Sequence, residues 1–244
     1  MSTVLQLDVG NSSAKWRLVR ADEIVTRGRF SPGDEAAAWD LFELGESPEH
    51  VLVASVSAPE TEARLLESLQ QRWQLQPWLA RSQAVTGDLR NSYEEPSRMG
   101  VDRWLAMLAA RQRCRGRVCV VDAGSALTID FIDADGSHQG GFIIPGPLLM
   151  ERALLLDTDR VRFAEDVDYD LQPGRSTAEA VRHGIALSQA GALRLALAQP
   201  AARGANLLFC GGGGESLMAL ADCGGELHPD LVFEGLQLMH DMTA

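Results

Sequence analysis

The chain has 244 residues, of which 45% are hydrophobic and 23% are charged, an ordinary balance for a folded globular protein. This composition excludes a wholly disordered or fibrous chain, and no run of residues is long and apolar enough to cross a membrane. The N-terminus has neither a basic segment nor a long apolar core, so we expect no signal peptide. A formal net charge of −12 disfavours binding to a phosphate backbone. We therefore expect no nucleic acid and no membrane among the partners.

The cysteines indicate a reducing compartment. There are four of them, none in a CxxC pair, and Cys119 and Cys210 lie in apolar runs. This pattern is typical of buried free thiols and not of a metal site or a disulfide framework. We expect reduced thiols in a cytoplasmic protein.

Basic residues are concentrated in one part of the chain. Lys15 is the only lysine, and six arginines fall within twenty residues, at positions 98, 103, 111, 113, 115 and 117. A solvated rim of helix and loop is the favoured interpretation, and a local anion-binding patch is the alternative.

The first half of the chain alternates apolar strands with helices. In chain order, the hydrophobic pattern predicts strands at 4–9, 15–20, 24–30, 51–56 and 76–79, and helices at 35–44, 59–73 and 99–113. Pro59 suits the first position of a helix. The polar stretch 87–96 is expected to be irregular.

The second half begins again with strands. The pattern predicts strands at 117–121, 127–132, 140–144 and 206–210, and helices at 148–156, 177–198, 215–221 and 229–242. The same order of elements thus occurs twice, with Asp8 and Asp122 in equivalent turns. We expect an α/β protein of two similar domains, 1–115 and 116–244, with the last helix packing back on the N-terminal half. Ligands usually bind in the cleft between such domains.

The turn after the first strand carries residue types that suit a phosphate group. Gly10 allows close approach of the backbone, Asn11 to Ser13 add neutral donors, and Lys15 adds a positive charge. Asp8 would repel phosphate unless it holds Mg²⁺, which prefers carboxylate and phosphate oxygens. A plain hairpin turn is the alternative.

Two glycine-containing turns follow strands of the second half. Asp122-Ala123-Gly124-Ser125 supplies another carboxylate, and with the first turn it favours a nucleoside triphosphate site. The tetraglycine 211–214 lies between a buried strand and a helix, so its backbone could approach a nucleotide. It is neither a P-loop nor a GxGxxG motif, and a flexible turn is the alternative.

Gly100-Val101-Asp102-Arg103 opens a predicted helix. Asp102 could accept a proton from a substrate hydroxyl, and Arg103 could hold an anionic group. Helix capping with a surface ion pair is the alternative.

Six motifs in chain order resemble those of the type III pantothenate kinases. They are Asp8–Ser12, Gly100–Arg103, Asp122–Thr128, Gly140–Gly146, Thr177–Ala180 and Gly211–Gly214. The resemblance covers about residues 4–235. It implies two ribonuclease H-like domains with mixed β-sheets flanked by helices and an active-site cleft between them, as in the sugar kinase, chaperone ATPase and actin superfamily. It also implies that ATP phosphorylates the primary hydroxyl of pantothenate to 4'-phosphopantothenate, the first step of coenzyme A biosynthesis.

The resemblance further implies a role for individual residues. Asp102 is expected to be the general base, and Thr177 is expected to enter the site from the neighbouring subunit of a homodimer. The other expected pantothenate contacts are Tyr93, Gly100, Val101 and Arg103. The expected ATP contacts are Asp8, Val9, Gly10, Asn11, Ser12, Ser13, Ala14, Lys15 and Ser125. Asp122 is expected to hold a monovalent cation, K⁺ or NH₄⁺, and Asp8 to hold Mg²⁺.

Two other functions remain open from the sequence. One is a kinase or phosphatase of the same superfamily acting on another small hydroxy compound or on acetate. The other is a non-catalytic transcription accessory factor, since some relatives have been described as Bvg accessory factor-like. The acidic charge argues against direct DNA binding, and a pure binding protein would need none of Asp8, Asp102 and Asp122.

Overall fold

The computed structural model describes residues 2–32 and 39–243. It divides the chain into two units. The first comprises Met1–Ala109 together with Leu231–Ala244, and the second comprises Ala110–Asp230.

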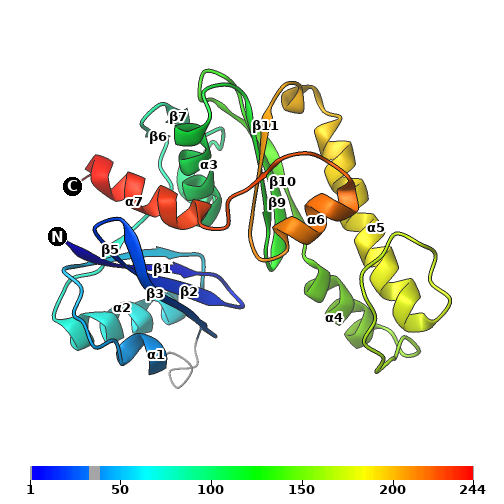
Figure 1. Ribbon diagram of the computed structural model, residues 1–244, viewed down its shortest axis with the longest axis horizontal. Coiled ribbons are helices and arrows are strands. Elements are labelled where there is room, and N and C mark those ends of the chain that lie inside the picture. The colour runs from blue at the N-terminus through cyan, green and yellow to red at the C-terminus, as the bar shows by residue number, and fades with distance from the viewer. Residues whose placement is uncertain (1, 33–38, 244) are drawn as a thin grey trace. The chain divides into compact units, whose positions relative to one another are not determined.

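The first unit is built on a five-stranded mixed sheet. Its strands are β1 (Thr3–Val9), β2 (Ala14–Arg20), β3 (Glu23–Phe30), β4 (His50–Ser55) and β5 (Trp78–Leu79). They lie in the order β3-β2-β1-β4-β5, in which β2 is antiparallel to β1 and β3, and β4 is parallel to β1 and β5 (Figure 1).

One face of this sheet carries the apolar core. Leu5, Leu7 and Val9 alternate along β1 and are fully buried in a cluster with Leu69 and Trp73 of helix α2 (Pro59–Trp73). Each fully buried aliphatic side chain of this kind contributes about 1.5–3 kcal/mol. Because these apolar residues alternate along β1, the side chains between them lie on the face of the sheet that is turned away from α2.

Helix α7 (Leu231–Thr243) covers the opposite face and so completes the first unit with residues from the end of the chain (Figure 1). Its contacts with the sheet include a polar group. Arg17 Nε donates to Gln6 Oε1 at 2.7 Å, and Gln6 Nε2 donates to Gln237 Oε1 at 2.7 Å. The Arg17 guanidinium also lies over the ring of Phe233, 4.8 Å from its centroid.

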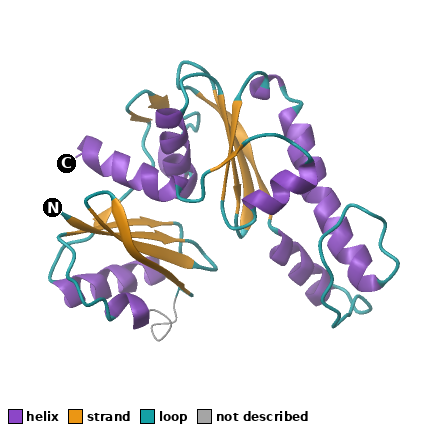
Figure 2. Cartoon of the chain, viewed as in Figure 1, coloured by secondary structure: helices purple, strands orange, loops and turns teal. Residues whose placement is uncertain are grey.

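The second unit repeats the strand order of the first. Its strands are β8 (Val118–Ala123), β9 (Ala126–Ile132), β10 (His138–Pro145), β11 (Asn206–Cys210) and β12 (Glu226–Leu227). They lie in the order β10-β9-β8-β11-β12, with antiparallel pairs on one side of β8 and parallel pairs on the other. Helices α5 (Thr177–Leu197) and α6 (Gly214–Ala221) pack on this sheet through Leu193 and Leu217. Helix α4 (Pro147–Asp157) follows β10, and Figure 2 shows the long loop between α4 and α5.

Most predicted elements are present, but strand β12 was not predicted, and two further regions differ from the expectation. The stretch expected to be irregular begins inside a short hairpin of β6 (Val85–Thr86) and β7 (Leu89–Arg90), which turns at Gly87 with φ +60°. The helix expected at 35–44 is described only as α1 (Trp39–Phe42), because residues 33–38 lie outside the described residues. Short 3₁₀ turns precede helix α3 (Val101–Arg113) at Pro96–Arg98 and strand β11 at Pro200–Ala202.

All four cysteines are free thiols. Burial raises the pKa of the Cys119 thiol to about 12. Within the described part of the chain, no helix has the length and apolar character needed to cross a membrane.

Candidate active site

The β1–β2 hairpin forms the first candidate turn. The backbone N–H of Gly10 donates to the carbonyl of Ser13 at 3.0 Å, and a Cβ on Gly10 would lie 3.0 Å from that same oxygen. Gly10 is therefore needed to close the turn, and its N–H is already used inside the protein. Asn11 and Ser12 are exposed at the tip, where their polar groups can meet a ligand.

Asp8 and Lys15 are direct cross-strand neighbours on this hairpin. Opposed residues of two antiparallel strands lie on the same face of a sheet. Because Leu7, Val9 and Trp16 occupy the core face, Asp8 and Lys15 lie on the other face. The hairpin thus places one carboxylate and one ammonium group on the same face of the sheet. The other face of these strands packs in the apolar core.

The start of α3 presents the carboxylate of Asp102. Its Oδ1 accepts a hydrogen bond from the backbone N–H of Arg103 at 2.8 Å. A Cβ on Gly100 would come within 2.5 Å of the same oxygen. The absence of a side chain at Gly100 therefore makes room for this carboxylate position.

Arg103 follows this carboxylate in the chain and contacts Tyr93 directly. The guanidinium of Arg103 donates to the Tyr93 hydroxyl at 3.0 Å and lies 5.8 Å from the ring centroid. Arg103 is only 6% exposed, so its charge is held in one place. Val101 is buried as well. The structure thus brings Tyr93 to Arg103, which is the neighbour of Asp102 in the chain.

In the second unit, Asp122 lies against the tetraglycine. A Cβ on Gly211 would overlap both Asp122 Oδ1 and the carbonyl oxygen of Ala123, and Gly211 has φ +78°. The N–H of Gly213 donates to the Ala123 carbonyl at 2.9 Å. No local sequence pattern indicates this contact, because the two segments are almost ninety residues apart. Two glycine properties, a left-handed backbone and no Cβ, are required here at one position.

Ser125 is exposed in the turn that follows Asp122. Its carbonyl accepts from the N–H of Gly146 at 3.0 Å, and a Cβ on Gly146 would overlap the backbone of Gly124 and Ser125. The Gly-Gly-Phe-Ile-Ile-Pro-Gly motif therefore ends by packing backbone against backbone on this turn. This leaves the Ser125 hydroxyl available at the surface of the unit.

The donor groups fit a cation that is shared with a bound phosphate. Among residues 2–32 and 39–243, no three His, Cys, Asp or Glu side chains form a group that could hold a metal ion. Mg²⁺ is commonly held by one or two carboxylates plus substrate phosphates, with water completing its shell. Single carboxylates such as Asp8 and Asp122 fit that arrangement.

Thr177 lies in a different environment. It is the first residue of α5 and lines an apolar groove of about 900 Å³ between α4 and α5, together with Leu149, Val161 and Ile185. Asp122, Gly211 and Ser125 do not line this groove, whereas Pro145 does. Within its unit, Thr177 is thus part of the α4–α5 surface.

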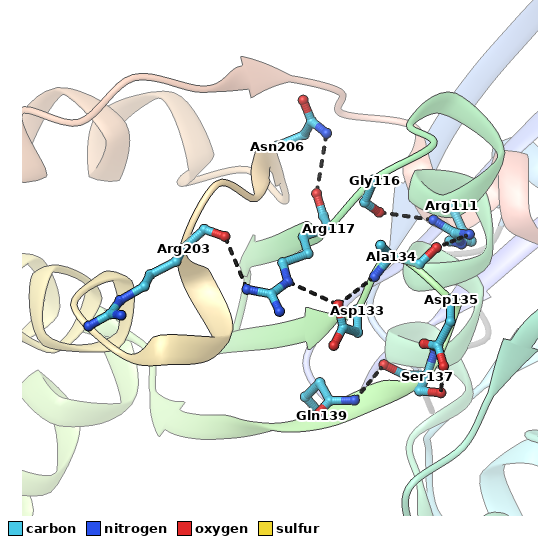
Figure 3. Close-up of polar contacts among 10 residues, drawn as sticks. All are labelled: Arg111, Gly116, Arg117, Asp133, Ala134, Asp135, Ser137, Gln139, Arg203 and Asn206. Atoms are coloured by element: carbon cyan, nitrogen blue, oxygen red, sulfur yellow. Dashed lines mark hydrogen bonds and ion pairs between the residues drawn. The ribbon is translucent and has the colours of Figure 1, made fainter.

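Two of the six clustered arginines serve local structure (Figure 3). Arg111 donates to the carbonyls of Gly116 and Ala134, both at 2.9 Å, and Arg117 Nε donates to Asp133 at 2.9 Å. These bonds tie the end of α3 and the start of β8 to the β9–β10 turn. Arg103 and Arg111 are buried, so the expected solvated rim does not describe these two arginines.

Comparison with known proteins identifies the family. The model of a protein family described as type III pantothenate kinase matches residues 4–199. The chain belongs to the type III pantothenate kinase family. A type III pantothenate kinase from Hahella chejuensis is 34% identical over 235 residues, covering 96% of both chains. One from Azotobacter vinelandii is 37% identical over 244 residues, covering 96% of this chain and 97% of its own.

Solved structures support the fold. A conserved putative Baf family transcriptional activator from Campylobacter jejuni has a TM-score of 0.63 at 22% identity, covering 98% of both chains. The activator of 2-hydroxyisocaproyl-CoA dehydratase from Clostridium difficile, solved with bound ADPNP, has a TM-score of 0.53 at 10% identity and covers 99% of this chain and 96% of its own. The expected fold of two ribonuclease H-like units with mixed sheets and flanking helices is confirmed.

Proposed function

We propose that this type III pantothenate kinase transfers a phosphoryl group from ATP to the primary hydroxyl of pantothenate, giving 4'-phosphopantothenate for coenzyme A biosynthesis. Family membership over most of the chain supports this reaction. The observation that carries the chemistry is the Asp102 carboxylate, held at the start of α3 in the space left by Gly100.

Asp102 acts as the general base. Its Oδ1 is oriented by the N–H of Arg103, and the carboxylate can accept the proton of the substrate hydroxyl. Phosphoryl transfer depends mainly on positioning and charge stabilisation, so a carboxylate fixed at a helix start suits the task.

Arg103 and Tyr93 bind the substrate beside the base. Pantothenate carries a carboxylate and several hydrogen-bonding groups, and a buried guanidinium can orient an anion of that kind. The hydrogen bond between Arg103 and Tyr93 keeps both side chains in one arrangement. Gly100 and Val101 contribute backbone to the same wall.

The β1–β2 hairpin and the turn after β8 bind ATP. The contacts on the hairpin come from Asp8, Val9, Gly10, Asn11, Ser12, Ser13, Ala14 and Lys15, and Ser125 contributes its hydroxyl. ATP supplies the phosphoryl group, and Asp8 would hold Mg²⁺, which would neutralise phosphate charge there. Lys15 stabilises the charge on the transferring group. Asp122, enclosed by Gly211, holds a monovalent cation, K⁺ or NH₄⁺.

The active form is a cytoplasmic homodimer, and Thr177 completes the partner's pantothenate site. The groove that contains Thr177 is apolar, and α4 exposes Leu148 and Leu156 to 78% and 66%. Exposed leucines of this extent beside a groove are typical of a surface covered by another protein chain. The four free thiols agree with a reducing compartment.

Pantothenate-dependent release of ADP tests the proposal, with MgATP and with or without K⁺. We expect turnover by the wild type and a loss of about 10²-fold or more in kcat for Asp102→Asn. Asp133→Asn is the matched control, because Asp133 lies in the β9–β10 turn and its side chain bonds Arg117 and Ala134. Equal activity of wild type and Asp102→Asn would remove Asp102 as the base.

A wild type without turnover in the presence of K⁺ or NH₄⁺ would refute pantothenate as the substrate. A panel of small hydroxy compounds and acetate would then identify a related kinase or phosphatase. Salt-sensitive DNA binding without ATP turnover would instead indicate a regulatory protein.

A further inference from the structure

A long irregular segment connects α4 to α5. Residues 158–176 contain neither helix nor strand, and Figure 2 shows them as a loop along α5. Irregular loops longer than about 12–15 residues are uncommon in compact domains and are usually functional or disordered. This segment ends at Ser176, whose side chain caps α5 directly before Thr177.

Arg182 of α5 holds this segment from its centre. Its guanidinium forms an ion pair with Asp166 and donates to the carbonyl of Val167. The rings of Phe163 and Tyr169 lie 5.9 and 5.8 Å from its central carbon. One side chain thus contacts four residues of the segment, spaced over seven positions.

The same guanidinium joins the segment to α4. Arg182 Nε donates to Glu151 Oε2 at 3.0 Å and a terminal nitrogen lies 3.4 Å from Oε1. Both side chains of this pair are mostly buried, with 17% and 14% exposed. The Tyr169 hydroxyl donates to the same carboxylate at 3.3 Å. Arg182 is therefore the common partner of α4, α5 and the loop between them.

The rest of the segment follows the first turns of α5 closely. A ring nitrogen of His183 lies 2.6 Å from the carbonyl of Gln172, and the N–H of Arg175 donates to Glu179 at 2.6 Å. A Cβ on Gly174 would overlap the backbone of Glu179 and Ala180. The segment is fitted to α5 by backbone contact, so a shift at Arg182 is transmitted toward Thr177.

The groove that contains Thr177 borders this arrangement. Val161 of the segment and Val181 of α5, which precedes Arg182, both line it. The position of the segment therefore sets one wall of the groove next to Thr177.

We infer that Arg182 is a positioning residue for pantothenate, which fixes the 158–176 segment between α4 and α5 and so sets the wall beside Thr177. The inference rests on the proposed function, in which Thr177 contacts pantothenate. A planar guanidinium is required for this role, because it can pair with two carboxylates and stack on two rings, which the ammonium group of lysine cannot do.

The test compares wild type, Arg182→Ala and Arg182→Lys by steady-state kinetics and by limited trypsin digestion. We expect Arg182→Ala to raise the KM for pantothenate about tenfold or more, with the KM for ATP unchanged, because misplaced binding groups weaken only the substrate that they contact. Trypsin should cleave Arg182→Ala after Arg160 and Arg162 of the segment faster than it cleaves the wild type at these positions. Arg182→Lys should show smaller changes of both kinds.

Arg194→Ala is the matched control. Arg194 lies on the same helix, and its Nε donates to the Ala221 carbonyl at 2.8 Å, away from the segment. It should leave the pantothenate KM and the cleavage after Arg160 unchanged. If Arg182→Ala does not fold, Arg182→Lys is compared with the wild type instead.

The outcomes separate the inference from the function on which it rests. A wild type that does not use pantothenate refutes the proposed function. An active wild type whose Arg182 variants keep the wild-type KM for pantothenate refutes the inference, as does an equal rise in the KM for both substrates.

Discussion

Gly235 of α7 lies directly against the backbone carbonyl of Leu105 of α3, so closely that a Cβ on Gly235 would overlap the carbonyl group. The two helices therefore cross backbone to backbone at this point. Leu105 is one helical turn after Asp102. Helix α7 thus holds α3, which carries the proposed base Asp102, in position.

We expect Gly235→Ala to destabilise the protein and to slow catalysis. The added methyl group meets backbone atoms, which cannot rotate away, so the helices must separate, at a cost of about 1–3 kcal/mol. Urea unfolding and kcat measure the two effects. Gly191→Ala is the control, because nothing lies within 4 Å of a Cβ there and alanine favours the helix by up to about 1 kcal/mol. Equal free energies of unfolding for Gly235→Ala and Gly191→Ala would contradict the close backbone contact between α7 and α3.

Gly100→Ala should reduce activity with little loss of stability. A Cβ at this position meets Asp102 Oδ1, the end of a side chain that can rotate. The base then leaves its position, and kcat should fall by about 10²-fold while the unfolding midpoint changes little. Gly45→Ala in the same unit is the control, since the space around Gly45 is open. A wild-type kcat in Gly100→Ala would show that the carboxylate position does not matter.

Two inactive variants should restore activity when their subunits are mixed. If Thr177 acts on the partner's site, a dimer of one Asp102→Asn subunit and one Thr177→Ala subunit has one intact site. Random reassortment of equal amounts then gives about one quarter of wild-type activity. Activity of the mixture that equals the mean of the two unmixed variants would place Thr177 in its own subunit's site, or in none.

The ion pair of Glu62 and Arg81 predicts a stability change with pH. Hydrogen bonding from Arg81, with a smaller contribution from Ser55, holds the pKa of Glu62 below its usual value. The folded state therefore favours the charged form, and this stabilisation is present above about pH 4.5 and lost as the pH falls through the lowered pKa. Because Arg81 is 57% exposed, the contribution should stay below about 1 kcal/mol.

Urea unfolding of wild type and Glu62→Gln checks this prediction. The wild type should be the more stable at pH 7, and the difference should disappear near pH 3. Glu67→Gln, on the exposed face of the same helix, is the control. A difference that persists unchanged at low pH would rule out the charge as its cause.

The sequence predicted the elements whose signals are local. The apolar runs of β1, β4, β8 and β11 and the glycine-containing turns after β1 and β8 could be recognised because strands and turns carry their own patterns. The short start of α3 could be recognised as a possible site for the same reason, because Gly100, Asp102 and Arg103 are neighbours in the chain.

The contacts between distant segments could not be predicted in this way. The contact of Gly211 with Asp122 and that of Gly235 with Leu105 depend on how separate elements pack, and a single glycine in a sequence does not show what lies against it. The β6–β7 hairpin is too short for an alternating pattern. It is stabilised instead by packing on α3, where Trp104 donates to Thr86 at 3.2 Å.

The return of α7 to the first unit also sets the order in which the protein can be completed during synthesis. The five strands of the first sheet leave the ribosome before the second unit is made, but α7 is translated last. Domains fold as they emerge, so the second unit can fold while the first still lacks its final helix. Until then the face of the sheet around Gln6 and Arg17 has no cover from α7, and a nascent chain without α7 would offer that face to chaperones.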